Sequence, residues 1–322
     1  MQASEAAEAQ RSSPAGQKLT AHPHGHAILG VAVSPDGQWF ATCGWHGHAA
    51  VWHAATGMRA LTLEGFHDVD SSVMHVAWSP KGTHLAAAVD NESMVWELAK
   101  PELLPVAQTL EGHADNVLSV TWSPSGAALC TGARDATARI WMLATGREVL
   151  ELDHDDADVH TVAWSPNGTY VATGGDEGSV SVWETVEGTA EYVLEGHMHT
   201  VDSVAWSPDG SMLVSCSRDH TARVWDVATG NAKHTLQGHN GGVSSVVWSP
   251  DGRFLATASG GRTVMLWDVA TGTATRVIEV SDSGVAESGM HGVVVSVAWG
   301  GGHVFAATDK GEVFIFSATE GQ

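Results

Sequence analysis

The feature that most constrains this chain is the regular spacing of its tryptophans. Twelve of its 14 tryptophans fall into two series, and the commonest step within a series is 42 residues, as from Trp122 to Trp164. Val33 fills the slot before the first series and Phe316 the slot after the second, so each series has seven positions. The first series is Trp78, Trp122, Trp164, Trp206, Trp248 and Trp299, and the second is Trp52, Trp96, Trp141, Trp183, Trp225 and Trp267. A repeat of this period predicts seven copies of one structural unit.

A proline turn follows most positions of the first series. The local text reads SPDG, SPKG, SPSG, SPNG, SPDG and SPDG. Proline presets one backbone angle and glycine supplies a positive one, so this text indicates a tight turn. Runs such as VLSVTW before the turn and LCTGA after it indicate two joined strands, and ARIWML and VLELD add two more. Four short strands in about 40–45 residues are typical of a propeller blade.

With these motifs the chain resembles the WD40-repeat family over about residues 19–316. In the fifth unit the signature is Gly196-His197, then WSPDG from Trp206, then a turn ending at Asp219, then Trp225-Asp226. The resemblance implies an all-β fold, a seven-bladed β-propeller of four-stranded antiparallel blades. It also implies that an N-terminal strand, residues 17–21, closes the ring against the unit ending at Phe316. We expect residues 1–15 to form a disordered acidic tail, 16–318 the single propeller domain and 319–322 a second tail.

Two units contain a histidine, a hydroxyl, an aspartate and a tryptophan at identical spacing. The sets are His113, Thr131, Asp135 and Trp141 in unit three, and His197, Ser215, Asp219 and Trp225 in unit five. His, Asp and a hydroxyl are also the parts of a nucleophilic triad. The same spacing in both units favours the structural alternative, because in WD40 proteins such a set resembles a buried hydrogen-bonded tetrad. We therefore expect no catalytic residue and no cofactor.

Other units depart from this tetrad. Unit six keeps its histidine, hydroxyl and tryptophan but has Gly261 at the aspartate position. Unit four has Glu177 there, and its histidine, His154, is displaced by one residue. We expect these blades to depend more on packing and less on hydrogen bonds.

Histidines are concentrated in the first unit, within HPHGH at 22–26 and WHGH at 45–48. Imidazoles of His24, His46 and His48 could bind Zn²⁺ or Ni²⁺. The alternative is a loop of weakly ordered histidines with one modified tetrad, in which His46 replaces the aspartate. The sequence has no motif of fixed metal spacing here, so we expect no metal. A separate acidic run at 151–160 is predicted to be a solvated loop that could attract a basic ligand.

The composition limits the choice of partners. Lys and Arg number 15 against 37 Asp and Glu, which gives a net charge of -22. Such a field repels nucleic acid and anionic lipid, so we expect other proteins, in particular basic peptides or surfaces. Three widely spaced cysteines do not form a disulfide framework, and no apolar stretch is long enough for membrane insertion. We expect an intracellular protein, cytoplasmic rather than nuclear, acting as a monomeric subunit of a complex.

The resemblance implies that partners bind the face formed by the turns between second and third strands and by the loops between blades, called here the top face. The positions that it projects there are Trp45, Met74, Val89, Leu118, Arg134, His160, Asp176, Asp202 and Arg218. The first four form an apolar half and the others a charged half. Ordinary strand packing explains Leu118 equally well. Exposed aromatic residues and arginines commonly anchor interfaces, so Trp45, Arg134 and Arg218 are the predicted anchors.

The predicted function is a WD40-repeat scaffold for protein–protein interactions, binding a peptide or domain on its top face, and not an enzyme. The sequence contains no phosphate-binding GxxxxGK[ST] loop and no HExxH zinc motif. The alternative is a propeller enzyme or metal-binding protein with its site at the central channel or at the histidine cluster of blade one. Residues 281–292 on the same face are predicted to form a mobile loop.

Overall fold

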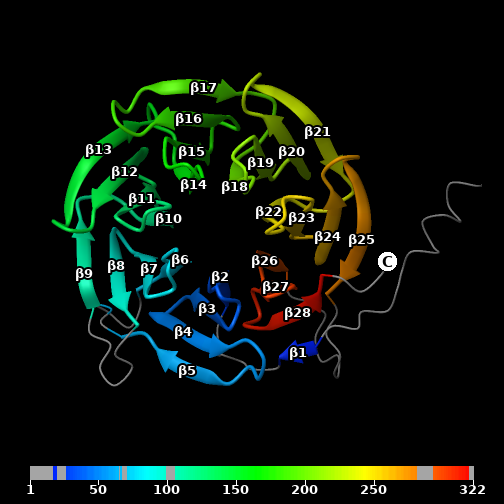
Figure 1. The fold of residues 1–322 in the computed structure, drawn as a ribbon, viewed down its shortest axis with the longest axis horizontal. Coiled ribbons are helices and arrows are strands. Elements are labelled where there is room, and N and C mark those ends of the chain that lie inside the picture. The colour runs from blue at the N-terminus through cyan, green and yellow to red at the C-terminus, as the bar shows by residue number, and fades with distance from the viewer. Residues whose placement is uncertain are drawn as a thin grey trace, which may run out of the picture.

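A computed structural model describes residues 17–19, 27–64, 66, 71–98, 106–280 and 293–318. In this part of the chain the secondary structure consists of strands and turns, without a helix. The strands form seven four-stranded antiparallel sheets arranged as blades around a central axis (Figure 1). The predicted all-β, seven-bladed propeller is confirmed. The two predicted tails, the histidines at 22–26 and the loop at 281–292 lie outside the described residues.

Each blade starts with a strand beside the central axis and continues outward. The innermost strands are β2 (Ile28–Val33), β6 (Val73–Trp78), β10 (Val117–Trp122), β14 (Val159–Trp164), β18 (Val201–Trp206), β22 (Val243–Trp248) and β26 (Val294–Gly300). The second strands are β3 (Trp39–Gly44), β7 (His84–Val89), β11 (Ala128–Ala133), β15 (Tyr170–Gly175), β19 (Met212–Ser217), β23 (Phe254–Ser259) and β27 (His303–Thr308).

The outer half of each blade completes the sheet. The third strands are β4 (His48–His53), β8 (Glu92–Glu97), β12 (Thr137–Met142), β16 (Val180–Glu184), β20 (Thr221–Asp226), β24 (Thr263–Asp268) and β28 (Val313–Ser317). The outermost strands are β5 (Arg59–Thr62), β9 (Val106–Glu111), β13 (Arg147–Asp153), β17 (Ala190–Leu194), β21 (Asn231–Gln237), β25 (Thr273–Glu279) and, in blade seven, β1 (Gln17–Leu19).

The N-terminal strand closes the ring. β1 pairs antiparallel with β28, so the first strand of the chain is the outermost strand of the last blade (Figure 1). Hydrophobic packing also joins the first and last blades. The ring centroids of Phe40 in blade one and Phe305 in blade seven lie 5.4 Å apart. This closure removes the sheet edge that an open stack would leave unpaired.

The proline turns join the first and second strands on the bottom face, opposite the top face. In blade one, Gly37 has a φ of 68° and donates its N–H to Ser34 O at 2.8 Å, while Ser34 Oγ donates to Asp36 Oδ1 at 2.6 Å. The glycine takes a left-handed conformation that side-chain-bearing residues rarely adopt, and the aspartate caps the turn. The local text therefore fixes where each hairpin turns.

The hydrophobic core lies between blades. One buried cluster joins Cys43 and Val51 of blade one to Val76, Leu85 and Trp96 of blade two. Corresponding clusters lie between the following pairs of blades. A single blade cannot bury both of its faces, so the blades stabilise one another as neighbours in a ring.

Candidate functional site

In blade three the structure brings the four side chains of the tetrad together. Trp141 Nε1 donates to Thr131 Oγ1 at 2.8 Å. His113 Nε2 lies 2.7 Å from the same hydroxyl, and His113 Nδ1 lies 2.8 Å from Asp135 Oδ2. Burial lowers the pKa of His113, although Asp135 opposes this shift, so the ring is neutral at neutral pH. The donors then run from indole to hydroxyl, to imidazole, to carboxylate.

Blade five repeats this arrangement. Trp225 Nε1 donates to Ser215 Oγ at 2.8 Å, and His197 bridges Ser215 Oγ and Asp219 Oδ2, each at 2.8 Å. Burial raises the pKa of Asp219, but hydrogen bonds from Thr221 and His197 outweigh it and lower the pKa to about 2. The carboxylate is therefore charged and holds the imidazole in one tautomer.

These tetrads satisfy buried polar groups and do not present a nucleophile. Thr131 and Ser215 are both 0% exposed. Each hydroxyl accepts from an indole and contacts an imidazole. A nucleophilic hydroxyl must reach a substrate, and these two are enclosed between strands. Their geometry is that of a network which pairs every buried polar atom.

Blades four and six replace the carboxylate differently. In blade six His239 Nδ1 lies 2.8 Å from Thr263 Oγ1, and burial lowers the pKa of His239 to about 4. In blade four the His154 ring packs on Trp183 with centroids 5.0 Å apart, and burial lowers its pKa to about 4. The indole of Trp183 still donates to Thr173 Oγ1 at 2.8 Å. The indole–hydroxyl bond thus persists where the aspartate is absent.

The first tryptophan series joins neighbouring blades, a role that the sequence did not reveal. Four of the six indole N–H groups donate to a backbone carbonyl of the preceding blade, whereas Trp164 Nε1 is buried without a hydrogen-bond partner. These pairs are Trp78 with Ala32 O at 3.2 Å, Trp122 with Ala77 O at 2.9 Å, Trp206 with Ala163 O at 3.1 Å and Trp248 with Ala205 O at 3.1 Å. The repeat spacing identified these tryptophans, but only the closed ring shows where their N–H groups point.

A second set of inter-blade bonds was also missed. In six of the seven blades, the side chain three residues before the first-series position accepts a hydrogen bond from the backbone of the next blade. The acceptors are Ser296 for Val31 N, His75 for Val120 N, Ser119 for Val162 N, Thr161 for Val204 N, Ser203 for Val246 N and Ser245 for Val297 N, at 3.1–3.4 Å. Gly30 takes this position in blade one, where a Cβ would lie 2.9 Å from Cys43 Sγ. The recurrent Ser/Thr was the available signal.

The apolar half of the projected top face is smaller than expected. Trp45 follows β3 and is 45% exposed. Met74 and Leu118 are the second residues of the inner strands of blades two and three and are half-buried. These three side chains lie at the same end of consecutive blades.

The prediction for Val89 is wrong, because this side chain is only 1% exposed and packs in the core between blades one and two. It is the last residue of β7 and pairs with Val73. In blade three, by contrast, Ala133 is the last strand residue and Arg134 lies beyond it. The blade-two turn contains only Asp90 and Asn91, one residue fewer, so the position equivalent to Arg134 is Asp90.

The charged half is an ion-pair network at blades four and five. Arg218 donates from Nε and Nη2 to the carboxylate of Asp202 at 3.0–3.2 Å. His160 contacts two carboxylates, with Nε2 3.2 Å from Asp176 Oδ1 and Nδ1 3.8 Å from Asp202 Oδ1. The structure therefore brings His160, Asp176, Asp202 and Arg218 together.

Arg134 joins the edge of this network through a residue that the sequence did not single out. Its Nε lies 4.0 Å from Asp158 Oδ2. Thr200 was missed as well, and its Oγ1 donates to Asp176 Oδ1 at 2.9 Å. Asp158 belongs to the acidic run at 151–160, which was the only indication of it.

The histidines of blade one are only partly described. His46 is exposed with a φ of 62°, and His48 is the first residue of β4. His24 lies outside the described residues. The prediction that these histidines hold no metal stays a prediction.

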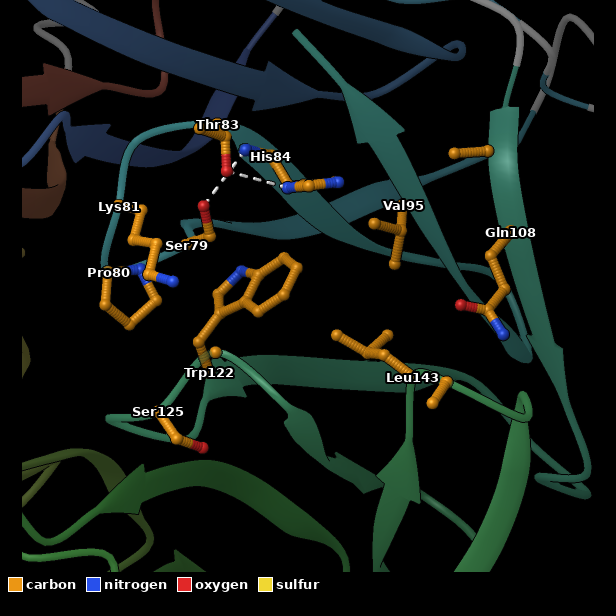
Figure 2. A pocket seen from close by; sticks show the side chains of 13 residues that line it. Ser79, Pro80, Lys81, Thr83, His84, Val95, Gln108, Trp122, Ser125 and Leu143 are labelled. Carbon is orange, nitrogen blue, oxygen red and sulfur yellow. Dashed lines mark hydrogen bonds between the residues drawn. The ribbon is translucent and has the colours of Figure 1, made fainter. Parts of the chain in front are cut away.

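Clefts between neighbouring blades open on the bottom face, among them two lined by described residues. One of about 420 Å³ lies between blades two and three and is lined by Trp122, Leu143 and Gln108. Figure 2 shows Trp122 between the turn that carries Pro80 and Lys81 and the side chain of Leu143. Lys81 stands where other blades have a capping residue. Ser79 Oγ still accepts from the backbone N–H of His84 at 3.0 Å, as Ser34 Oγ does from Trp39 in blade one.

The other bottom cleft explains the tryptophan that the repeat did not account for. It has about 390 Å³, lies between blades one and two, and is lined by Trp39, Trp78, Leu61 and Leu98. Trp39 also packs edge-on against His53, with ring centroids 5.0 Å apart. Of the two tryptophans outside the series, Trp39 therefore faces the bottom and Trp45 the top.

The fold and these networks define a β-propeller whose blades repeat one hydrogen-bonded plan. The family model for the WD domain, G-beta repeat, matches residues 16–53, 60–97, 105–142, 146–184, 188–226 and 230–268, more than half of the chain. The chain belongs to the WD40-repeat family, whose propellers generally serve as protein-interaction scaffolds. Blade seven lies beyond the last matched segment and carries Phe316 in place of the second-series tryptophan.

Curated relatives are similar over parts of this chain. Small ribosomal subunit protein RACK1z of Oryza sativa subsp. japonica is 30% identical over 125 residues, 38% of this chain and 36% of its own length. WD repeat-containing protein 1 of Bos taurus is 34% identical over 82 residues, 25% of this chain and 14% of its own. The Chromatin assembly factor 1 subunit FAS2 homolog of Oryza sativa subsp. japonica is 32% identical over 124 residues, which are 37% of this chain and 24% of its own length. The chain thus spans about a third or less of the length of these relatives.

Within the described residues, no helix has the length and apolar character needed to cross a membrane.

Proposed function

We propose that this chain is a scaffold subunit that binds a basic segment of a partner protein across its top face. Trp45, with Met74 and Leu118, supplies the apolar contacts. Arg134, His160, Asp176, Asp202 and Arg218 supply the charged contacts. The observation that carries the proposal is that an exposed tryptophan and an ion-pair network lie on the same face of the ring.

The preference for a basic segment follows from charge. Both arginines already face carboxylates, so they do not offer a free positive field. Asp176 is 51% exposed at its side chain, where it contacts His160 and Thr200. With a net charge of -22, the protein attracts cationic partners at long range, and salt weakens that attraction.

The names of two relatives support an assembly role. One is named as a small ribosomal subunit protein and another as a subunit homolog of a chromatin assembly factor. We propose that this chain likewise acts as one copy within a larger complex, inside the cell and in the cytoplasm, without a catalytic step of its own.

The test is affinity purification with quantitative mass spectrometry. The double variant Trp45→Ala/Arg218→Ala should lose the partners that wild type captures. The matched control is Met58→Ala, because Met58 is 70% exposed in the same blade as Trp45 but in a bottom-face turn. An unchanged partner set in the double variant, or equal loss in Met58→Ala, would rule out the top face.

A further inference from the structure

Three side chains with metal-binding atoms converge on the top face of blade four. Asp158 lies immediately before β14, His160 is within β14, and Asp176 lies immediately after β15. One ligand atom from each side chain lies within 4.8 Å of the other two. Among the described residues, this is the group of three possible metal ligands that lie so close together. Adjacent antiparallel strands place these positions at one end of the blade, so the convergence depends on the sheet register.

The His160 ring has a buried nitrogen without a hydrogen-bond partner. This nitrogen, Nε2, lies 3.2 Å from Asp176 Oδ1. That contact has the distance of a hydrogen bond without the geometry of one. Buried ring nitrogens are normally partnered. Two atoms bound to one tetrahedral Zn²⁺ at about 2.0–2.2 Å lie about 3.3 Å apart, which is close to the spacing found here.

Further contacts orient the candidate ligands. His160 Nδ1 faces Asp202 Oδ1 at 3.8 Å, and Arg218 holds that carboxylate through Nε and Nη2. A histidine that binds metal through one nitrogen commonly turns the other toward a carboxylate. On the other side, Thr200 Oγ1 donates to Asp176 Oδ1 at 2.9 Å. His160 and Asp176 are therefore each supported by a residue of blade five.

The local charge favours a cation. Three carboxylates, Asp158, Asp176 and Asp202, meet around a single imidazole. Arg218 is bound to Asp202, and Arg134 reaches Asp158 only at 4.0 Å. The side chains of Asp158 and Asp176 are 33% and 51% exposed, so their carboxylates have room to rotate onto an ion.

We propose that Asp158, His160 and Asp176 form a binding site for a divalent transition-metal ion, with Zn²⁺ as the best fit. One imidazole nitrogen and two carboxylate oxygens suit Zn²⁺ better than Ca²⁺ or Mg²⁺, which prefer shells of oxygen alone. Three protein ligands leave a fourth position for water or for a donor group on a partner. Asp202 is a positioning residue, because it acts through His160. The site goes beyond the proposed scaffold function and does not require a partner.

The experiment uses the metal-free full chain, titrated with Zn²⁺ by calorimetry and with Co²⁺ by visible absorption. Wild type should bind one equivalent with the intense absorption of four-coordinate Co²⁺. His160→Gln and Asp176→Asn should each weaken binding by at least about 10-fold, and Asp202→Asn by about 10-fold. Circular dichroism of each metal-free variant verifies that it folds.

Two controls make the result decisive. His220→Asn removes an exposed histidine from the top-face turn of blade five, where asparagine tolerates the φ of 70°, and it should bind like wild type. Trp45→Ala should also bind the ion normally, even where it has lost its protein partners, so failure of the scaffold proposal is distinguishable. No one-to-one binding by wild type, or unchanged binding in His160→Gln and Asp176→Asn, would overturn the proposal.

Discussion

Blades five and six share the same hydrogen-bonded series of tryptophan, hydroxyl and histidine, but the histidine Nδ1 atom has a different partner in each. In both, the indole donates to a hydroxyl at 2.8 Å and that hydroxyl contacts the imidazole Nε2. In blade five the Nδ1 atom of His197 meets the Asp219 carboxylate. In blade six Gly261 takes the aspartate position and His239 Nδ1 meets Thr263 Oγ1. The inner part of the network is therefore independent of the acid.

The difference shows what the carboxylate contributes. Burial lowers the pKa of both histidines, but Asp219 partly offsets this for His197, whereas nothing offsets it for His239. The backbone N–H of Met198 also donates to Asp219, at 3.1 Å, so the acid ties the loop between blades four and five to the turn of blade five. Blade six has no carboxylate for the equivalent loop.

The largest expected effect is acid destabilisation through blade six. The pKa of His239 is about 4 in the folded protein and 6.5 for an ordinary histidine, so the unfolded chain takes up the proton first. Stability is therefore complete above about pH 6.5 and falls by on the order of 3 kcal/mol as the pH approaches 4. Urea unfolding across this range should show that His239→Gln is less stable at neutral pH but less sensitive to acid. The same pH slope in both proteins would contradict this.

Removing the aspartate of the blade-five tetrad should destabilise the protein nearly as much. Asp219→Ala removes the carboxylate that His197 Nδ1 and the Met198 N–H contact, leaves the buried imidazole without its acidic partner, and should lower the free energy of unfolding by about 1–3 kcal/mol. Glu195→Ala, an exposed acid in the preceding loop, is the control and should have little effect. Equal stabilities of the two variants would show that the tetrad is dispensable.

The threonine after the turn should matter more in blade six than in blade five. Thr263→Val removes the partner of His239 Nδ1 and should cost about 1 kcal/mol. Thr221→Val in blade five should cost about 0.5 kcal/mol, because Asp219 still holds His197. Thermal unfolding of the two variants measures the difference. The reverse order would mean that Thr263 is not the substitute for the acid.

The smallest expected effect is an increase in stability. Gly261→Asp should place a carboxylate near His239 and the Asn240 N–H, as Asp219 does for the matching residues of blade five. The new Cβ would lie 3.2 Å from Gly241 N, which limits the gain to about 0.5 kcal/mol. The variant should also lose less stability in acid, because the carboxylate raises the pKa of His239. Denaturation at two pH values measures both, and an unchanged acid response would argue against this placement.

Much of the fold was predictable because each blade is contiguous in sequence. The tryptophan period, the SPDG-type turns and the constant spacing from His197 to Asp219 are local signals, and the sheet register reproduces them. The regular repeat that made these predictions possible also explains why the prediction for Val89 was wrong. That prediction assumed a constant turn length, and the blade-two turn is one residue shorter.

The candidate site was less predictable, because its residues come from two blades. The projection placed His160, Asp176, Asp202 and Arg218 on one face but did not predict that His160 stands between two carboxylates. Asp158 and Thr200 precede their strands by one residue each, where the repeat gives no distinguishing signal. Asp158 contacts Arg134 of blade three and Thr200 contacts Asp176 of blade four, so both contacts form only when neighbouring blades pack together.

The sequence by itself determined the number of blades, the position of each hairpin and the composition of each tetrad, because turn chemistry and hydrogen bonds within a blade act over a few tens of residues. Only the tertiary structure decided how blades join. The bond from Val31 N to Ser296 Oγ spans 265 residues, and that from Trp78 to Ala32 O spans 46. Such contacts form when the ring closes, and ring closure also determines which charged side chains of neighbouring blades face one another.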